Sequence, residues 1–358
     1  MNKRILVISA TLIFLLGSSL GFAKEEHVTL EKATAVALEN SLSLIAAQLE
    51  LDDARLALDQ ARAENLVKPN PANLIQAEYN YDIARRKLLM TEFEVAMEVK
   101  QDYYTVLKAQ DMVELTTKAL ELSERQLTVA KSKFAAGTGT QSEVINSVGA
   151  VAKSKANLAE AEGGYQLALL KFRQTLGVSL DAVYLPGALP TTEFEAYLPN
   201  LERDLDFALN NRVEVIQVNA GILAAQTQIE AFTNDYTPEL ALRRATVALR
   251  TTENMAKQLR YGITLELRQN YINLQTAQRK LEAEQESVKE AKENQRIAQR
   301  LLEANMATHD QVLASEVGLL QATINARHAL YDYDLGVLKY QKAAAYPLKT
   351  LTDQEKEH

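Results

Sequence analysis

The chain has 358 residues, with 13 glycines and 7 prolines, and Ala, Leu, Glu, Gln and Lys dominate its middle, a composition typical of long helices. It has no cysteine, which excludes a disulfide framework, a thiolate metal site and a lipid-modified N-terminal cysteine. The formal net charge is −8 and becomes −10 (−8 − 2) once Lys3 and Arg4 are removed with a leader, so the charge balance argues against a nucleic-acid partner.

Residues 1–23 are predicted to be a secretory signal peptide. They combine a short basic start, the apolar run Ile5–Leu16 and the small residues Gly21 and Ala23 near the expected cleavage point. The alternative is an uncleaved membrane anchor, because the stretch up to Phe22 is nearly long enough to span a bilayer. No other segment approaches a transmembrane helix, so the mature chain is expected to be exported.

Residues 24–177 are predicted to form one long antiparallel helical hairpin. Apolar residues recur at a helical period through 28–66, and the sequence KPNPAN at 68–73 breaks this helix because proline cannot continue it. A longer helix is expected over 74–134 and a return helix over 143–176. At 1.5 Å per residue these three helices span roughly 58, 90 and 50 Å, so the long helix pairs with two shorter helices stacked end to end.

The long helix carries an apolar residue at every seventh position, which predicts a left-handed coiled-coil seam. The members are Val99, Val106, Val113, Leu120, Leu127 and Phe134. A second apolar line, Leu115, Leu122 and Val129, lies on roughly the opposite side and predicts that the helix packs against neighbours on two sides. The alternative is an ordinary two-stranded coiled coil with some apolar scatter. In the return helix, Gly163 and Gly164 predict a kink or a close helix approach.

Residues 131–147 (KSKFAAGTGTQSEVINS) are predicted to form the tip of this hairpin. Gly137 and Gly139 supply positions that reach positive φ, which a tight reversal needs. Thr140 and Glu143 form a T-x-x-E capping box, in which two side chains satisfy backbone N–H groups where the helix restarts. The run GTGT is not a phosphate-binding loop, since no G-K-[ST] follows it and no strand pattern precedes it.

Residues 178–200 are a predicted proline-containing linker, and the hairpin pattern then recurs over 201–346, followed by a polar tail, 347–358, that is expected to be disordered. The offset is 171 near the start and 168, or twenty-four heptads, farther along. The seam therefore continues in phase through Leu267, Leu274, Leu281 and Val288. In the second tip Asn305 replaces Gly137, and a T-x-x-Q box consists of Thr308 and Gln311.

The doubled order of four segments resembles the TolC-type outer-membrane efflux family across the mature chain. These segments are LEKATAVALENS, its second copy LERDLDFALNNR, the tip KFAAGTGTQSEVINS and the segment ARHALYDYDLGVLKYQKA near the end of the second repeat. The resemblance implies a homotrimer whose six hairpins form a hollow α-helical tunnel in the periplasm or cell envelope, associated with an outer membrane where the host has one. It also implies that the tips meet a periplasmic adaptor (membrane fusion) protein and an inner-membrane pump. The residues it places at the adaptor are Ala136, Gly137, Thr138, Gly139, Ala304, Asn305, Met306 and Ala307, with Glu143 where the family often has an acidic tip residue.

The sequence departs from the family at the two breaks in the helical pattern. The family inserts two membrane strands in each repeat there, and each such strand needs about 9–11 residues. The break at 68–73 has no room, and the break at 234–239 is followed only by a weak alternation over 240–249. The expected fold is therefore all-α: two tandem coiled-coil hairpins, a trimeric α-barrel tunnel and no β-barrel.

No enzyme site is predicted. The four histidines are dispersed without metal-ligand spacing, and no nucleophile, carboxylate-pair or nucleotide pattern stands out, so neither a cofactor nor a metal is expected. The favoured function is a passive export conduit. The alternative is a non-conducting coiled-coil scaffold or spacer of the cell envelope, while a periplasmic adaptor is disfavoured because adaptors carry β-rich modules.

Overall fold

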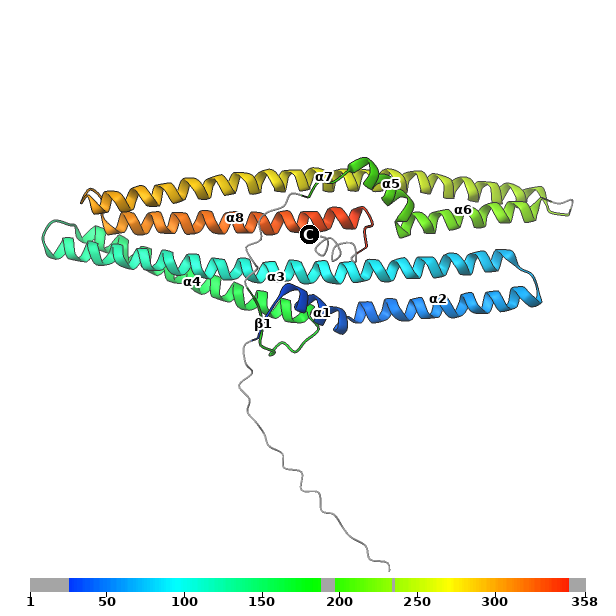
Figure 1. Cartoon of the computed structure of the whole chain (residues 1–358), viewed down its shortest axis with the longest axis horizontal. Coiled ribbons are helices and arrows are strands. Elements are labelled where there is room, and N and C mark those ends of the chain that lie inside the picture. The colour runs from blue at the N-terminus through cyan, green and yellow to red at the C-terminus, as the bar shows by residue number, and fades with distance from the viewer. Residues whose placement is uncertain (1–25, 188–196, 234–235, 348–358) are drawn as a thin grey trace, which may run out of the picture.

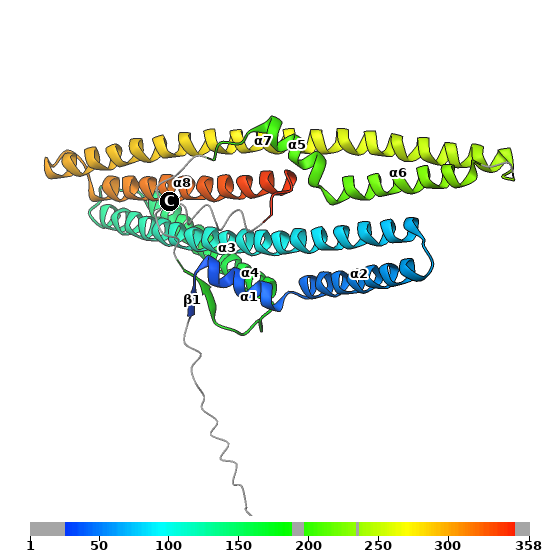
Figure 2. The same ribbon diagram turned by 45° about the vertical axis from the view of Figure 1, so that its right-hand side comes forward.

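The computed structural model describes residues 26–187, 197–233 and 236–347. The predicted signal peptide, all of the predicted polar tail except Pro347, and part of the predicted linker lie outside the described residues. The described chain forms a long rod built from helices that run nearly parallel to one axis (Figures 1 and 2).

Each half of the rod contains two short helices, one long helix and one return helix. In chain order the elements are β1 (Glu26–Val28), α1 (Leu30–Asn40), α2 (Leu42–Val67), α3 (Pro71–Ala135), α4 (Gln141–Thr175), β2 (Tyr184–Pro186), α5 (Leu201–Asn211), α6 (Val213–Phe232), α7 (Glu239–Glu303) and α8 (His309–Ala343). The long helices α3 and α7 have 65 residues each, α4 and α8 have 35 each, and α1 and α5 have 11 each. The prediction of two tandem hairpins, each with one long helix against shorter ones, is confirmed.

Three local expectations differ from the structure. The helix expected over 28–66 is two helices, and Ser41 both ends α1 and caps α2 by accepting a hydrogen bond from the N–H of Leu44. The break predicted at 68–73 is confirmed, since α2 ends at Val67, but the long helix begins at Pro71 and not at 74, because a proline in the first turn leaves no helical bond unmade. At Gly163 and Gly164 an added Cβ would meet nothing within 4 Å, so no helix of the same chain lies close there, and the alternative expectation of a kink stays a prediction.

No pattern in the sequence indicated the small parallel pairing of β1 with β2. Each strand has only three residues, too few to show an alternating pattern. Tyr103 of α3 ties the pair to the rod: its hydroxyl donates to the carbonyl oxygen of Gly187 at 2.7 Å and lies 3.0 Å from that of Val28.

Apolar side chains hold each hairpin together. Val99 and Val106 of α3 are completely buried, and so is Leu267 of α7. The burial declines toward the tip, where Phe134, the last member of the predicted seam, is 49% exposed. In the first hairpin the core is thus thinner near the tip, whereas Val312 and Leu313 stay buried close to the second tip.

Polar pairs join the two hairpins to each other along the contact between α3 and α8. Asp111 of α3 is 4% exposed and accepts from Arg327 at 2.5 Å, with the ring of His328 at 3.1 Å. Further ion pairs along the same contact are Glu94–Lys342 (2.8 Å), Lys100–Asp334 (2.6 Å) and Lys108–Asp332 (2.5 Å). Because each pair joins a residue of the first hairpin to a residue of the second, these ion pairs fix how the two hairpins pack side by side.

The helices lie as one layer rather than as a closed bundle. Toward the tips the order across the layer is α4, α3, α8, α7, and toward the other end it is α2, α3, α6, α7 (Figure 1). The layer therefore has two edges: α2 and α4 form the first-repeat edge, and α7 forms the second-repeat edge.

Candidate functional site

The first hairpin tip lies between α3 and α4 and reverses the chain in five residues. Gly137 has φ +72°, and the N–H groups of Thr138 and Gly139 both donate to the carbonyl oxygen of Lys133, at 2.9 and 3.1 Å. The bond from Thr138 spans five residues and closes the helix end in the manner of a Schellman motif. The backbone carbonyl groups at the end of α3 therefore accept hydrogen bonds from N–H groups of the tip itself.

The second tip, between α7 and α8, repeats this geometry with different residues. Asn305 has φ +57°, and the N–H groups of Met306 and Ala307 donate to the carbonyl oxygen of Leu301 at 2.7 and 3.2 Å. These bonds are the counterparts of those in the first tip at an offset of 168. Both tips lie at the same end of the rod (Figures 1 and 2).

A reciprocal capping box restarts the helix after each tip. The N–H of Glu143 donates to the Thr140 hydroxyl at 3.2 Å, and the N–H of Thr140 donates to the Glu143 carboxylate at 2.8 Å. Thr308 and Gln311 make the same two bonds at 2.8 and 3.2 Å. A carboxylate at the first box and an amide at the second give the two tips different charge, although Asp310 lies beside the second box.

Most side chains of the predicted adaptor-contacting residues are exposed. Ala136, Gly137 and Thr138 are exposed at the first tip, and Ala304, Asn305 and Met306 at the second, whereas Gly139 and Ala307 are half-buried. Their role in contacting an adaptor stays a prediction.

The edges of the layer carry a second candidate surface that sequence reasoning did not assign. Large apolar side chains are exposed along each edge helix at helical spacing. They are Leu42, Ile45, Leu49 and Leu56 on α2, Ile145, Val148, Leu167 and Leu170 on α4, and Val247, Leu265, Ile272, Ile297 and Leu301 on α7. The heptad spacing of Leu42, Leu49 and Leu56 was visible in the sequence, but it did not reveal that this face of α2 has no neighbour within the chain.

Within residues 26–187, 197–233 and 236–347, no group of three or more His, Asp or Glu side chains is arranged to hold a metal ion. Among the helices of those residues, none is both long enough and apolar enough to cross a membrane.

The comparisons with known proteins agree with the duplicated helical design. Residues 67–178, which run from the end of α2 to just beyond α4, match the family model described as outer membrane efflux protein. No curated protein matches the sequence of this chain.

Solved structures of membrane proteins share the fold at low sequence identity. The Campylobacter jejuni CmeC outer membrane channel is similar over 100% of this chain and 97% of its own, with 12% identity and a TM-score of 0.67. The outer membrane protein VceC from Vibrio cholerae matches over 89% of this chain and 96% of its own, with 15% identity and a TM-score of 0.63. A membrane protein from Pseudomonas aeruginosa matches over 88% and 93%, with 15% identity and a TM-score of 0.63. The resemblance to TolC-type outer-membrane efflux proteins is thereby confirmed, by the match of residues 67–178 to the outer membrane efflux protein family model and by a fold similar to those of the solved structures above.

Proposed function

We propose that this chain is the subunit of a passive efflux conduit of the cell envelope, associated with the outer membrane. Three copies close into a hollow α-helical tunnel through which substrate passes without any bond being made or broken. The tips meet a periplasmic adaptor protein, and an inner-membrane pump supplies the energy. The conduit itself performs no catalysis.

The two unpaired edges of the layer carry this proposal. An isolated rod would leave a row of leucines and isoleucines in water along both edges, and contiguous exposed apolar surface of this kind marks an interaction site. The two edges are different surfaces, so an edge-to-edge contact is heterologous. A heterologous contact generates a ring where its rotation closes after a whole number of copies, and an open filament where it does not.

The edge residues are also at compatible heights along the rod. Glu50 of α2 pairs with Lys87 of α3 at 2.5 Å, which fixes the height of α2 against α3. Leu42 lies eight residues before Glu50, level with the part of α3 about eight residues beyond Lys87. Across the layer, Lys100 of α3 pairs with Asp334 of α8, and an added Cβ at Gly336 would lie 3.6 Å from the side chain of Leu274, nine residues beyond Leu265. Leu42 on one edge and Leu265 on the other therefore lie within about two helical turns of the same height, so copies can join edge to edge with a small axial shift.

The test uses the absence of cysteine in the wild-type chain. Leu42→Cys and Leu265→Cys are introduced singly and together, the purified chains are treated with a short bis-maleimide, and their mass is measured by light scattering. We expect a native mass of three chains for all variants, covalent trimers for the double variant and no cross-linked species for either single variant.

Two outcomes would overturn the proposal. A monomer would favour the spacer function, since a rod that needs no neighbours encloses no tunnel. Cross-linked dimers from a single-cysteine variant would mean that like edges meet, which gives a closed pair and not a ring. Met306→Cys, at the second tip and far along the rod from both Leu42 and Leu265, is the matched control for non-specific cross-linking.

A further inference from the structure

The contact between the two hairpins of one chain predicts how hairpins of different copies meet. Within the chain, α3 of the first hairpin packs against α8 of the second. At the offset of 168, α7 is the counterpart of α3 and α4 is the counterpart of α8. These counterparts lie at the two edges of the layer (Figure 1). When copies join edge to edge, α7 of one copy and α4 of the next can therefore repeat the contact that α3 and α8 already make.

The counterpart residues on the two edges are complementary in size. At the contact within the chain the rings of Tyr104 and Tyr331 stack, with 4.5 Å between centroids. Their counterparts at the offset of 168 are Ile272 and Gly163. Ile272 is 55% exposed, and an added Cβ at Gly163 would meet nothing within 4 Å. The open space beside the glycine on one edge can thus receive the branched side chain from the other.

The charged residues at this contact change sign between the two repeats. Within the chain, the buried Asp111 of α3 accepts from Arg327 of α8, with the ring of His328 at 3.1 Å. The counterpart of Asp111 is Arg279, and the counterpart of His328 is Glu160. An acid on α3 and bases on α8 are therefore replaced by a base on α7 and an acid on α4.

Neither of these edge charges is used within one copy. Glu160 and Arg279 are exposed, and they form no ion pair with any residue that the structure describes. A lone charge of this kind is well solvated on a free copy and gains a partner when the edges meet.

The half of the rod away from the tips shows the same complementarity. There α3 faces α6 across a groove of about 310 Å³, and Gln76 and Ala224 are among the lining residues. On the edges, α7 corresponds to α3 at the offset of 168, and α2 corresponds to α6 at the offset of 171. The counterparts of Gln76 and Ala224 are therefore Arg244 and Asp53, a base on one edge and an acid on the other.

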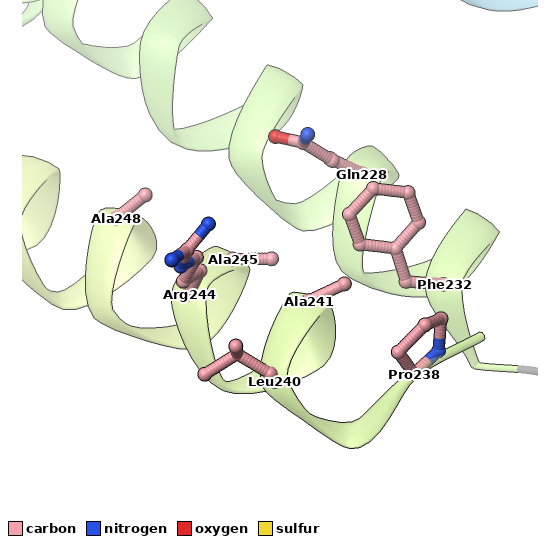
Figure 3. A pocket seen from close by; sticks show the side chains of 8 residues that line it. All are labelled: Gln228, Phe232, Pro238, Leu240, Ala241, Arg244, Ala245 and Ala248. Carbon is pink, nitrogen blue, oxygen red and sulfur yellow. The ribbon is translucent and has the colours of Figure 1, made fainter.

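Arg244 and Asp53 also lack an ionic partner within one copy. Arg244 lines a groove of about 460 Å³ between α6 and α7, with Gln228 and Phe232 on the opposite side (Figure 3). None of the described residues that line this groove is acidic. Asp53 is exposed on α2, and neither Arg244 nor Asp53 forms an ion pair with a residue that the structure describes. Both charges are therefore available to a neighbouring copy.

We propose that the edges of two copies meet in the register of the contact between α3 and α8. Arg279 of one copy then pairs with Glu160 of the next, and Arg244 pairs with Asp53. This inference rests on the proposed conduit. It adds which residues pair between copies and why each edge selects the other edge and not its own kind.

The reversed polarity disfavours contacts between like hairpins. If α3 met α4 of another copy in this register, Asp111 would lie beside Glu160. If α7 met α8 of another copy, Arg279 would lie beside Arg327 and His328. Like charges at an interface suppress the wrong partner more than opposite charges strengthen the right one. Each first hairpin is thus directed to a second hairpin on both sides, and the two kinds of hairpin alternate around the assembly.

The test reverses the charges of one pair. Glu160→Arg and Arg279→Glu are made singly and together, and the fraction of trimer is measured by sedimentation velocity over a dilution series at low salt. Each single variant should raise the concentration at which half of the chains are trimeric about tenfold, because like charges then face each other at every contact of the ring. The double variant restores the pair in the opposite order and should return to within about twofold of the wild type.

Glu160→Arg combined with Arg268→Glu is the matched control. It has the same net charge as the double variant, but Arg268 lies 11 residues before Arg279 on α7. That separation is about 16 Å along the helix, beyond the distance over which exposed charges interact at physiological salt. The control should therefore stay as weak as Glu160→Arg alone. Circular dichroism of each variant checks that the helices are intact.

The outcomes separate this inference from the conduit on which it rests. A double variant as weak as the single variants, or a control that recovers as well as the double variant, would overturn the proposed register, while a trimeric wild type would leave the conduit standing. A wild-type chain that is monomeric at every concentration would contradict the conduit itself, and the inference with it.

Discussion

The base of each hairpin contains the same joint, built twice with different chemistry. In the first repeat the joint is apolar: Ala33 of α1 and Phe172 of α4 are at most 1% exposed and belong to one hydrophobic cluster. The ring of Tyr103 meets Phe172 edge to face, with 5.8 Å between centroids.

In the second repeat the counterparts are polar. Asp204 replaces Ala33 at the offset of 171, and Tyr340 replaces Phe172 at the offset of 168. The Asp204 carboxylate is completely buried and accepts from the hydroxyls of Tyr340 and Tyr346, at 2.9 and 2.7 Å, and from Arg203 at 3.2 Å. Burial, and after it the hydrogen bond to Asp204, raises the pKa of Tyr346 to about 12.

The comparison shows that one backbone accepts either core provided that facing residues change together. A buried carboxylate without donors costs far more than the same site filled by a methyl group, so an aspartate at the first joint would need a hydroxyl that Phe172 lacks. Conversely, the two hydroxyls at the second joint need an acceptor. The duplicated hairpin therefore preserves the pairing of residues at the joint and not their polarity.

The largest effect is expected from breaking the polar joint on one side only. Asp204→Ala leaves the hydroxyls of Tyr340 and Tyr346 buried without their acceptor and should lower the free energy of unfolding by about 3 kcal/mol. Adding Tyr340→Phe, which recreates the Ala–Phe pair of the first repeat, should recover part of that loss. The measurement is urea unfolding at one fixed chain concentration, because an assembling chain changes apparent stability with concentration.

The single variant Tyr340→Phe completes the double-mutant cycle. If the two single losses simply add in the double variant, the residues are not coupled, and the view that they changed as a pair is wrong.

A smaller effect is expected where the return helices end. Gly177 has φ +67°, and a Cβ there would lie 2.7 Å from the Cβ of Asn40, so Gly177→Ala should cost about 2 kcal/mol. Its counterpart Ala345 already has φ +62°. Ala345→Gly should stabilise by about 0.5 kcal/mol, because relief of the left-handed conformation outweighs the added freedom of glycine in the unfolded chain. Both changes in stability are measured from the midpoints of urea unfolding. If both substitutions stabilised the chain, or both destabilised it, this account would be wrong.

Much of the fold follows from local patterns in the sequence. The heptad spacing and the equal offsets predicted the paired long helices. Both capping boxes could be predicted because their partners are three residues apart. The hydrogen-bonded joint around Asp204 could not be predicted. Asp204 lies in LERDLDFALNNR, where an acidic residue resembles the solvated face of a helix, and its partner Tyr340 is 136 residues away.

The candidate surfaces show the same limit. The seam was predicted to continue to Phe134, but that side chain is half exposed because the helices near the tip have fewer neighbours within one chain. The end of α1 at Ser41 was also not predicted. A serine within a continuous helical pattern does not by itself indicate a helix end, and only the structure shows that its side chain caps the next helix. Local bonds can be inferred from spacing, whereas burial depends on which elements meet.

The smallest effect is expected at the tips, where two different residues occupy the same left-handed position. Asn305→Gly should change the stability by only a few tenths of a kcal/mol, because asparagine tolerates positive φ nearly as well as glycine, whereas Asn305→Val should cost about 1–2 kcal/mol. Gly137→Val should cost at least as much for the same reason, since an added Cβ there meets no atom within 4 Å and the conformation alone opposes it. Helix content, measured by circular dichroism, should stay nearly constant in all three, because the turn follows the last helical residue. A valine tolerated at Gly137 but not at Asn305 would mean that the two tips are held by different forces, and the equivalence of their hydrogen bonds would then not extend to their energetics.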